Sequence, residues 1–421
     1  MPDASGLEDN RSVDLDAFSY LLTPAGQALL GSLRDYDPAR ELAEATRLRR
    51  EHPAELVSAA LGQARLRQRA EAKFGADAYR MYFTPDGVEQ ATRTEVAEYR
   101  AECFTALGVR RLADLCCGIG GDAIALARAG VAVLAVDRDP LTCAVARANA
   151  ESLGLADLIE VRCADVTEIA TSGYDAVFVD PARRGGRSGG VSRSQSVRGG
   201  GRATGGRIFD PESYSPSLSW AIGAAREVPV AALKVAPGIP HEAVPDDAGA
   251  EWISYRGDVK EAVLWFGKNP GSVSATLLPS AGTLWTGAPL PDPPAGPVGR
   301  YLHEPDGAVI RAHLVAEVAE QVGGRLIDET IAYITADELR PTPFATAYEI
   351  TDVLPFGLKK LKALLRQRGV GVAVIKKRGS AIEPEDLRKK LKLEGPHSVT
   401  VFLTRVAGAP SMLLGRPVNE P

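Results

Sequence analysis

The chain has 421 residues, of which 45% are apolar and 24% are charged, so it can bury a full core and is not mainly disordered. At roughly 100–200 residues per domain, this length predicts two to four domains. No apolar run approaches the roughly 18 residues of a membrane helix, and the acidic, polar start over 1–18 is unlike a targeting signal. We therefore expect a cytoplasmic protein that does not contact a membrane.

Basic residues are concentrated in two segments, although the net charge of the chain is −5. Seven arginines and no acidic residue lie in 183–207, and twelve basic and three acidic residues lie in 359–392. Concentrated basic segments in an otherwise acidic chain predict an anionic partner. The alternative is a charged, solvated surface without a partner.

The five cysteines all lie between residues 103 and 163, and none forms a CxxC pair. This spacing is neither that of a disulfide framework nor that of a zinc site, so we expect no metal. We expect the thiols to stay reduced and to pack as small apolar side chains. The residues concerned are Cys103, Cys116, Cys117, Cys143 and Cys163.

The first 80 residues predict a helical region. Asp37 and Pro38 form a helix start, with the aspartate as N-cap and the proline at the first helical position. The segment 53–74 is rich in Ala, Leu, Arg and Gln, which favour helix. No catalytic motif occurs in this part of the sequence.

Short apolar runs alternate with helical stretches from residue 110 onward, which is typical of a doubly wound, Rossmann-like α/β sheet. A strand is expected over 175–179, and its run 176–179 is apolar without alternation, as expected for a central parallel strand covered on both faces. We expect this domain over 81–286. The other expected strands are 112–116, 131–136, 159–162, 230–235, 252–255 and 262–266, and the expected helices are 120–129 and one that starts at Asp139.

A proline-rich segment over 287–298 predicts a stiff linker, and a small α+β module is expected after it, over 299–421. The predicted helix 356–368 of this module places Leu361 and Leu365 inward and its basic residues outward. The other expected elements are helices at 311–322 and from Pro384, and strands near Ile331, near Tyr348, at 370–376 and at 398–404.

A glycine-rich turn follows the first of the α/β strands and leads into a helix, with the sequence Asp114-Leu-Cys116-Cys-Gly118-Ile-Gly120-Gly-Asp122. Glycines let the backbone turn sharply and approach a ligand closely. The spacing departs from the GxGxxG of a dinucleotide fold, and the two carboxylates would repel a pyrophosphate. The turn therefore favours a ligand with a cationic amino group.

Acidic residues also stand at the carboxyl ends of the next three strands. Asp137 ends the second strand, where an acid can bind ribose hydroxyls, and Asp165 follows the third, where a carboxylate can accept from an adenine amino group. Asp180 ends the fourth strand, directly before Pro181. Any one of them could be a helix N-cap, but together with Asp114 they predict a ligand site at the strand edge where open α/β sheets bind.

The motifs DLCCGIGGD, VDRDP, CAD and DPARR, which cover roughly 110–185, resemble those of class I S-adenosylmethionine-dependent methyltransferases. More narrowly, the whole chain resembles the bacterial methyltransferases that carry a C-terminal THUMP-like domain, a family thought to act on RNA. The helical region and the segment FTPDGVEQATR at 83–93 also look like that family.

The resemblance implies S-adenosylmethionine as the cofactor. Asp114, Cys116 and the loop from Gly118 to Gly120 would hold its methionine part. Asp137 would bind the ribose, with Arg138 beside the adenine and Asp165 at the adenine edge. Phe83 and Thr84 resemble the segment that closes over the cofactor in guanosine N2-methyltransferases, although Thr84-Pro85 also fits an ordinary helix N-cap. The implied cofactor-binding residues are Thr84, Asp114, Cys116, Gly118, Gly120, Asp137, Arg138, Asp165 and Asp180.

The candidate catalytic residues are Asp180, Pro181 and Arg183. A strand-end aspartate can accept hydrogen bonds from an amino group, orient its lone pair and offer negative charge as the nitrogen becomes cationic. The motif departs from the D-P-P-aromatic form common among amino-group methyltransferases. Covalent methylation of carbon would need a cysteine after the fifth strand, and none occurs beyond Cys163, so a nitrogen acceptor is favoured.

The Gly/Arg-rich insert at 184–207 predicts a mobile loop whose arginines, Arg184 and Arg187 among them, could bind phosphates or stack on bases. A low-complexity expansion without function is the alternative. In the C-terminal module, THUMP-like domains are associated with RNA, which is bound mainly through phosphates and shape. The candidate RNA-binding residues there are Lys359, Lys360, Lys362, Lys376, Lys377 and Arg378.

The sequence therefore predicts an S-adenosylmethionine-dependent methyltransferase that acts on a base nitrogen of structural RNA (rRNA or tRNA). One alternative is a methyltransferase for a protein or a small molecule, in which the basic module has another purpose. Another is a catalytically silent protein that binds the cofactor and RNA. A nicotinamide-dependent dehydrogenase fits poorly, because the glycine spacing is wrong and no hydride-handling residue stands out.

Overall fold

The computed structural model describes residues 15–182, 211–279 and 282–418. Contacts divide the chain into two compact units, one formed by 1–248 with 263–270 and the other by 249–262 with 271–421. The helical region expected over 1–80 thus belongs to the same unit as the first α/β strands. The domain boundaries expected at 81–286, 287–298 and 299–421 follow a different division and stay a prediction.

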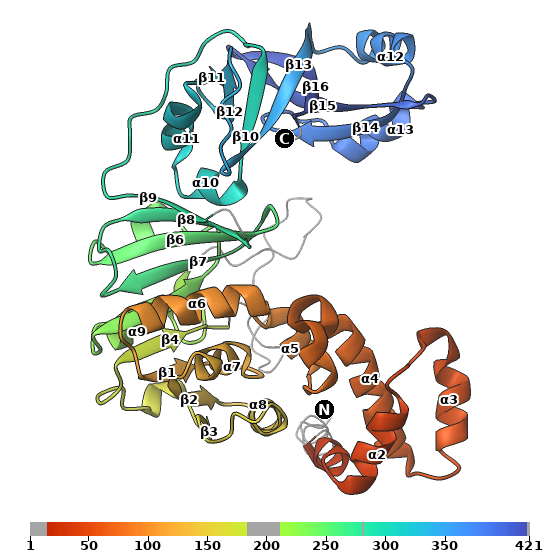
Figure 1. Cartoon of the computed structure of the whole chain (residues 1–421), viewed down its shortest axis with the longest axis vertical. Coiled ribbons are helices and arrows are strands. Elements are labelled where there is room, and N and C mark those ends of the chain that lie inside the picture. The colour runs from red at the N-terminus through yellow and green to blue at the C-terminus, as the bar shows by residue number, and fades with distance from the viewer. Residues whose placement is uncertain (1–14, 183–210, 280–281, 419–421) are drawn as a thin grey trace, which may run out of the picture. The chain divides into compact units, whose positions relative to one another are not determined.

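The N-terminal part of the first unit is helical, as predicted (red to orange in Figure 1). Asp37 accepts a hydrogen bond from the backbone N–H of Ala39, as an N-cap should, but it caps only a short 3-10 turn, and the α-helix begins at Glu41. Residues 15–21 are also helical. The helices are α2 (Pro24–Ser32), α3 (Glu41–Leu48), α4 (Ala54–Phe74), α5 (Pro85–Gln90) and α6 (Thr94–Ala106).

Five parallel strands of the first unit form the predicted doubly wound sheet, in the order β3-β2-β1-β4-β5. The chain moves outward from β1 to β3 and then returns to the other side of β1, so the order reverses between β1 and β4. Ligands of such sheets bind outside the carboxyl ends of the strands at this reversal. The strands are β1 (Arg111–Leu115), β2 (Ala132–Asp137), β3 (Ile159–Cys163), β4 (Ala176–Val179) and β5 (Val230–Val235), and the helices are α7 (Gly121–Arg128), α8 (Pro140–Ser152) and α9 (Leu218–Ala225).

The central strands are buried on both faces. Every residue of β4 and β5 is buried, and so are the last four residues of β1. Such continuous burial explains why these strands are apolar without alternation. It also makes Asp114 and Lys234, the charged residues inside these buried runs, exceptions that require an explanation.

Four further strands follow, of which the sequence predicted parts of two. β6 and β7 are longer than the expected 252–255 and 262–266, and β8 and β9 were not predicted. β8 pairs with β6 in parallel and with β9 in antiparallel direction. Their bounds are β6 (Ala248–Tyr255), β7 (Asp258–Phe266), β8 (Val273–Leu278) and β9 (Gly282–Thr286).

The C-terminal part of the second unit has a seven-stranded sheet in the order β11-β12-β10-β13-β16-β15-β14. Its α+β class was predicted, but β10, β11 and β16 were not. The strands are β10 (Tyr301–Pro305), β11 (Arg325–Asp328), β12 (Ile331–Ala336), β13 (Ala345–Pro355), β14 (Val370–Lys377), β15 (His397–Val406) and β16 (Ala409–Pro417).

The helix expected over 311–322 starts later than predicted. It is α11 (Val315–Val322), and a separate short helix, α10 (Gly307–Arg311), ends where the expected one was to begin. His313, between them, has a φ of 58°, in the left-handed region that a continuous right-handed helix cannot contain. Nothing in the sequence marks this break, because the residue is not a glycine.

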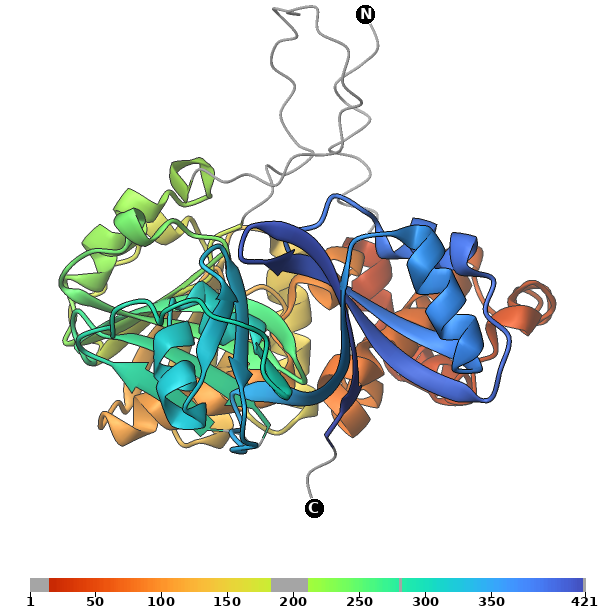
Figure 2. The same cartoon turned by 90° about the horizontal axis from the view of Figure 1, so that it is seen from above.

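Two helices, α12 (Leu358–Gln367) and α13 (Pro384–Leu391), pack against the β14 end of this sheet (Figures 1 and 2). Leu361 and Leu365 of α12 are fully buried, as predicted. They share a core with Leu387 and Leu391 of α13. The opposite side of α12 carries the lysines, so the amphipathic pattern of this helix was predicted correctly.

The proline-rich segment lies along β11. The backbone N–H of Gly296 donates to the carbonyl of Leu326 at 2.8 Å, and the N–H of Leu326 donates to the carbonyl of Pro294 at 2.9 Å. Part of the expected linker is therefore fixed to the second unit.

In the part of the chain that the structure describes, no helix is long and apolar enough to span a bilayer.

Candidate active site

The turn between β1 and α7 has three residues in the left-handed region: Cys116 (φ 69°), Gly118 (φ 56°) and Gly120 (φ 86°). For a cysteine this conformation is costly, and such strain is often found at functional sites. A Cβ on Gly118 would meet no atom within 4 Å, so the backbone there is open to a ligand. Gly120 is the N-cap of α7, which explains the glycine requirement at that position.

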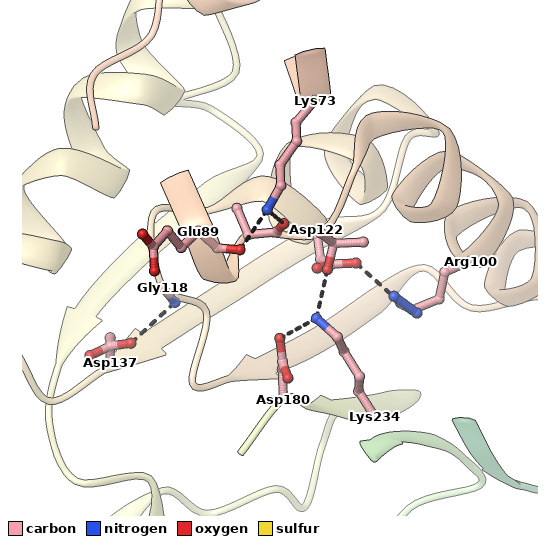
Figure 3. Close-up of polar contacts among 10 residues, drawn as sticks. Lys73, Glu89, Arg100, Gly118, Asp122, Asp137, Asp180 and Lys234 are labelled. Atoms are coloured by element: carbon pink, nitrogen blue, oxygen red, sulfur yellow. Dashed lines mark hydrogen bonds and ion pairs between the residues drawn. The ribbon is translucent and has the colours of Figure 1, made fainter. Parts of the chain in front are cut away.

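Asp137 fixes this turn from the end of β2. Its Oδ2 accepts a hydrogen bond from the N–H of Gly118 at 3.1 Å (Figure 3). Its Oδ1 accepts one from the N–H of Asp139 at 3.0 Å. Partial burial raises the pKa of Asp137, while these backbone donors act in the opposite direction. The carboxylate is thus oriented by the backbone and keeps unused lone pairs.

Asp114 is a buried carboxyl group without a partner. The residue is 1% exposed, and among the described residues neither of its side-chain oxygens has a hydrogen-bond partner. Burial raises its pKa well above the usual value, and the nearby charges of Asp122 and Asp180 raise it further. A cationic group bound beside Asp114 would reverse both effects, so this position fits a positively charged ligand.

Asp122, in the first turn of α7, is paired with Arg100 of α6 at 3.1 Å (Figure 3). The Arg100 side chain is 1% exposed and its guanidinium lies 4.5 Å from the centre of the Phe178 ring. A buried arginine against a carboxylate and an aromatic face is a rigid arrangement, which fixes α6 to α7 beside the strand edge.

Asp180 and Lys234 form an ion pair at the carboxyl ends of β4 and β5. Lys234 Nζ lies 2.7 Å from Asp180 Oδ2 and also donates to the hydroxyl of Thr92 at 3.0 Å (Figure 3). The side chain of Lys234 is 4% exposed and that of Asp180 is 24% exposed. The ammonium is enclosed, whereas the carboxylate keeps a solvent-accessible part.

The charges near β1 and β4 fit S-adenosylmethionine, whose sulfonium and amino groups are both cationic. Asp180 and Asp122 each have a buried cation as partner, whereas Asp114 has none. This excess of carboxylate suits a cation and disfavours a phosphate. The open backbone at Gly118 provides a place for close approach.

The segment before α5 is held by two buried amide side chains. Gln63 of α4 accepts from the N–H of Phe83 at 3.0 Å and donates to its carbonyl at 2.7 Å. Asn149 of α8 accepts from the N–H of Tyr82 at 2.7 Å and donates to the carbonyls of Tyr82 and Ile119. Through Asn149 the helical region is therefore bonded to the glycine-rich turn.

Phe83 and Thr84 take part in this local structure. The Phe83 side chain is 1% exposed and its ring centre lies 5.5 Å from that of Phe74, so the ring packs inside the protein core. The hydroxyl of Thr84 accepts from the N–H of Gly87 at 3.0 Å and caps α5. The N-cap alternative for Thr84 is confirmed, and its contact with the cofactor stays a prediction.

The other predicted cofactor residues lie at the surface. Arg138 and Asp165 are exposed. The Asp165 carboxylate accepts from the backbone N–H and the hydroxyl of Thr167, and Asp165 thereby caps a short turn. Pro181 is buried directly after Asp180. Arg183, Arg184 and Arg187, with the rest of the insert at 184–207, lie outside the described residues.

All five cysteines are free thiols, but they are not uniformly buried. Cys117 and Cys143 are buried, Cys103 and Cys116 are half-buried, and Cys163 is exposed, which corrects the expectation for the last. Burial raises the pKa of the Cys116 thiol, so it is not an activated nucleophile. Within the described ranges, no group of three or more His, Cys, Asp or Glu is arranged to hold a metal ion.

The predicted RNA-binding residues are of two kinds. Lys359 and Lys360 are exposed and Lys362 is half-buried, all on α12. The others are engaged in contacts within the chain. Lys376 and Arg378 both face Glu304 and lie over the rings of Tyr348 and Tyr333, and Lys377 pairs with Glu383 at 2.5 Å.

Sequence reasoning missed several residues of this site. Lys234 had a signal, because a lysine inside the apolar run Ala-Ala-Leu-Lys-Val of a central strand needs a buried partner. Thr92, Arg100, Gln63 and Asn149 had none, since their partners are distant in sequence; Lys234 and Thr92, for instance, are 142 positions apart.

Similar proteins are known in Mycobacterium tuberculosis. In the strains H37Rv and CDC 1551, an uncharacterised S-adenosylmethionine-dependent methyltransferase is 35% identical over 360 residues, a match that covers 82% of this chain and 92% of the relative. The chain belongs to the S-adenosylmethionine-dependent methyltransferases. The enzyme class and the cofactor predicted from the sequence are thereby confirmed.

Three family models match separate parts of this methyltransferase. They are a domain of unknown function over 14–70, RNA cap guanine-N2 methyltransferase over 109–192, and THUMP domain-like over 345–417. A crystal structure from Porphyromonas gingivalis W83, assigned as a candidate methyltransferase, superposes with a TM-score of 0.69 at 20% identity and covers 91% of this chain and all of that chain. This similarity supports the fold.

Proposed function

We propose that this methyltransferase transfers the methyl group to a base nitrogen of a structural RNA, such as rRNA or tRNA. The observation that carries the proposal is the position of Asp180. It ends β4 at the reversal of strand order, its carboxylate is partly accessible, and it lies within the segment that resembles RNA cap guanine-N2 methyltransferases.

In this proposal the cofactor lies along the glycine-rich turn. Asp114 and the backbone from Cys116 to Gly120 hold its methionine part, supported by the unpartnered carboxyl group and the open backbone at Gly118. Asp137, oriented by two backbone donors, binds the ribose hydroxyls. Thr84, Arg138 and Asp165 complete the site from the neighbouring loops.

The bound cofactor supplies an electrophilic methyl group, and the protein positions the amine that attacks it. Asp180 accepts a hydrogen bond from the amine N–H and directs the nitrogen lone pair, while its negative charge stabilises the positive charge that develops on nitrogen. Pro181 and Arg183 follow Asp180 at the end of the strand and are proposed to contact the base. A base stacked in a duplex cannot reach this position, so a flipped or unpaired base is required.

The second unit would select the RNA. The THUMP domain-like match includes α12, whose lysines Lys359, Lys360 and Lys362 form a basic surface without acidic residues on the helix itself. RNA is held mainly through phosphates and shape, which such a surface can provide. Lys376, Lys377 and Arg378 would contribute only by exchanging their carboxylate partners for phosphates, and Arg184 and Arg187 stay candidates from the sequence.

Mass spectrometry of the nucleosides in total RNA tests this function. RNA from cells without the gene should lack one methylated nucleoside, and adding back the wild-type chain, but not Asp180→Asn, should restore it. Purified enzyme should then methylate RNA from the deletion strain. If labelled methyl groups from the cofactor enter only protein or small molecules, the proposed RNA substrate is wrong.

A further inference from the structure

Lys234 carries a buried positive charge next to the proposed acceptor carboxylate. Its Nζ lies 2.7 Å from Asp180 Oδ2, and its second hydrogen bond, to the hydroxyl of Thr92, has a length of 3.0 Å (Figure 3). The side chain is 4% exposed and extends from the fully buried strand β5. A lysine is rarely enclosed in this way unless its charge is used or neutralised.

We propose that Lys234 is a positioning residue for methyl transfer, which holds the Asp180 carboxylate so that its free oxygen points toward the substrate amine. This inference rests on the proposed role of Asp180. It adds the requirement that the carboxylate acts as one half of an ion pair, with Oδ2 bound to the ammonium and Oδ1 left for the substrate.

The local charge distribution makes such a cation necessary. Asp180 lies close enough to Asp114 for their charges to interact, and Asp122 is a further neighbour of Asp114. Without Lys234, Asp180 would face these carboxylates with no cation beside it, and its side chain would lose the hydrogen bond that fixes its direction.

The ion pair also fits the fate of the proton. The amine lone pair forms the new N–C bond, and the electrons of the broken S–C bond stay on sulfur. The methylated nitrogen is then positively charged and must lose one proton. A carboxylate held by an ammonium is a weak base, so it stabilises this cationic nitrogen by hydrogen bonding while the proton leaves to water. Because Asp180 neutralises the ammonium, the pair does not repel a positively charged cofactor.

Thr92 sets the position of the ammonium. It is 6% exposed and lies in the loop just before α6, and its hydroxyl accepts from Lys234. The ammonium is therefore held by groups from two separate segments, the end of β4 and the loop before α6. This arrangement predicts that Thr92→Val lowers kcat for methyl transfer, as a change of Lys234 does, but by a smaller factor.

The test compares Lys234→Met with Lys234→Arg in the full chain. We expect Lys234→Met to bind S-adenosylmethionine with nearly unchanged affinity, to keep the KM for RNA, and to lose about tenfold or more in kcat at pH 7, because the acceptor carboxylate is no longer held in place. Lys234→Arg should restore part of kcat. Lys268→Met, at a half-buried lysine that lies over Trp265, is the matched control and should behave as wild type.

A second readout needs no turnover. In the full chain labelled with carbon-13 at aspartate carboxyls, with Asp180→Asn to assign the signal, the Asp180 resonance at pH 7 should move in Lys234→Met, which lacks the ammonium partner, and return most of the way in Lys234→Arg. An unchanged resonance in Lys234→Met would overturn the proposal, as would a loss of kcat that comes with weaker cofactor binding and a lower melting temperature. If the wild type methylates no RNA, the proposed substrate fails, and this resonance still decides the role of Lys234.

The variant Thr92→Val keeps the proposal testable if Lys234→Met does not fold. It leaves both charges in place and removes only the hydroxyl that accepts from the ammonium. Its kcat and its Asp180 resonance should shift in the same direction as expected for Lys234→Met, by a smaller amount. No shift in either measurement would then contradict the inference.

Discussion

The two compact units contain clear examples of two different uses of charged residues. In the first, Arg100 and Lys234 have side chains that are 1% and 4% exposed, and each faces a particular carboxylate. In the second, Lys359 and Lys360 of α12 are exposed, and no ion pair joins either of them to another described residue. Buried charges determine local geometry and are costly to remove, whereas exposed charges attract at a distance, are screened by salt and contribute little individually.

Asp180→Asn should give the largest effect, because it removes the proposed acceptor charge and retains the shape. We expect kcat to fall by about a hundredfold or more, as when a group that stabilises transition-state charge is lost. Binding of S-adenosylmethionine, measured by calorimetry, should change little, since the methionine and ribose contacts lie elsewhere. Activity near that of the wild type would show that the buried charges at this strand edge serve structure alone.

Asp137→Ala should mainly affect the cofactor. It removes the acceptor of the Gly118 N–H and the proposed ribose contact, and hydrogen bonds to a charged group contribute about 1.5–3 kcal/mol, so we expect affinity to fall by about ten- to a hundredfold. Asp175→Ala is a matched control, because this carboxylate also accepts from backbone N–H groups, those of Arg110 and Arg111, at the opposite ends of the strands. It should lower the melting temperature and leave cofactor affinity intact. Equal losses of affinity in both variants would contradict the ribose assignment.

The parallel sheet could be predicted from the sequence because its signals are local. Continuous apolar strands, glycine turns and the strand-end acids Asp114, Asp137 and Asp180 all occur within short stretches. Strands such as β9 and β16 escaped prediction because their sequences are short or mixed, although each pairs with the strand directly before it. The break at His313 escaped because no glycine marks its left-handed backbone in the sequence.

The site could be predicted only in part, for a related reason. The glycine-rich turn and the acids that end the strands follow from the fold class, but the groups that orient them do not. Asn149 contacts Tyr82 across 67 positions, and Lys234 contacts Asp180 across 54. Periodicity carries no information about such pairs. The exposed lysines of α12 were predictable, because an amphipathic helix shows both of its faces in its sequence.

The lysines of α12 in the second unit should contribute to RNA binding as a group. Replacing Lys359, Lys360 and Lys362 by glutamine should weaken RNA binding and reduce the slope of log K against log salt by about 2, because each phosphate contact on single-stranded RNA contributes about 0.7. Kd values from fluorescence anisotropy at several salt concentrations measure this slope. The triple variant Arg34→Gln, Arg49→Gln and Arg50→Gln makes the same change in net charge at exposed positions of the N-terminal region and should leave the slope unchanged.

The smallest effect concerns His303, a buried titratable group of the second unit that contrasts with its exposed lysines. It is 0% exposed, neither ring nitrogen has a hydrogen-bond partner among the described residues, and burial lowers its pKa. Above the unfolded value of about 6.5 the ring is neutral in both states and titration contributes nothing. Below that value the unfolded chain gains a proton that the folded chain resists, so stability is lost as the pH falls, by up to about 1.4 kcal/mol per pH unit.

His303→Leu should remove this loss of stability at low pH. The melting temperature of the wild type, followed by calorimetry between pH 7.5 and 5.5, should fall more steeply than that of the variant, and the two curves should converge toward neutral pH apart from a constant offset due to packing. Methyl transfer at neutral pH should be unaffected, because His303 lies in the core of the second unit. Parallel curves would mean that His303 is protonated equally well in both states and that this unit accommodates a buried charge as the first unit does.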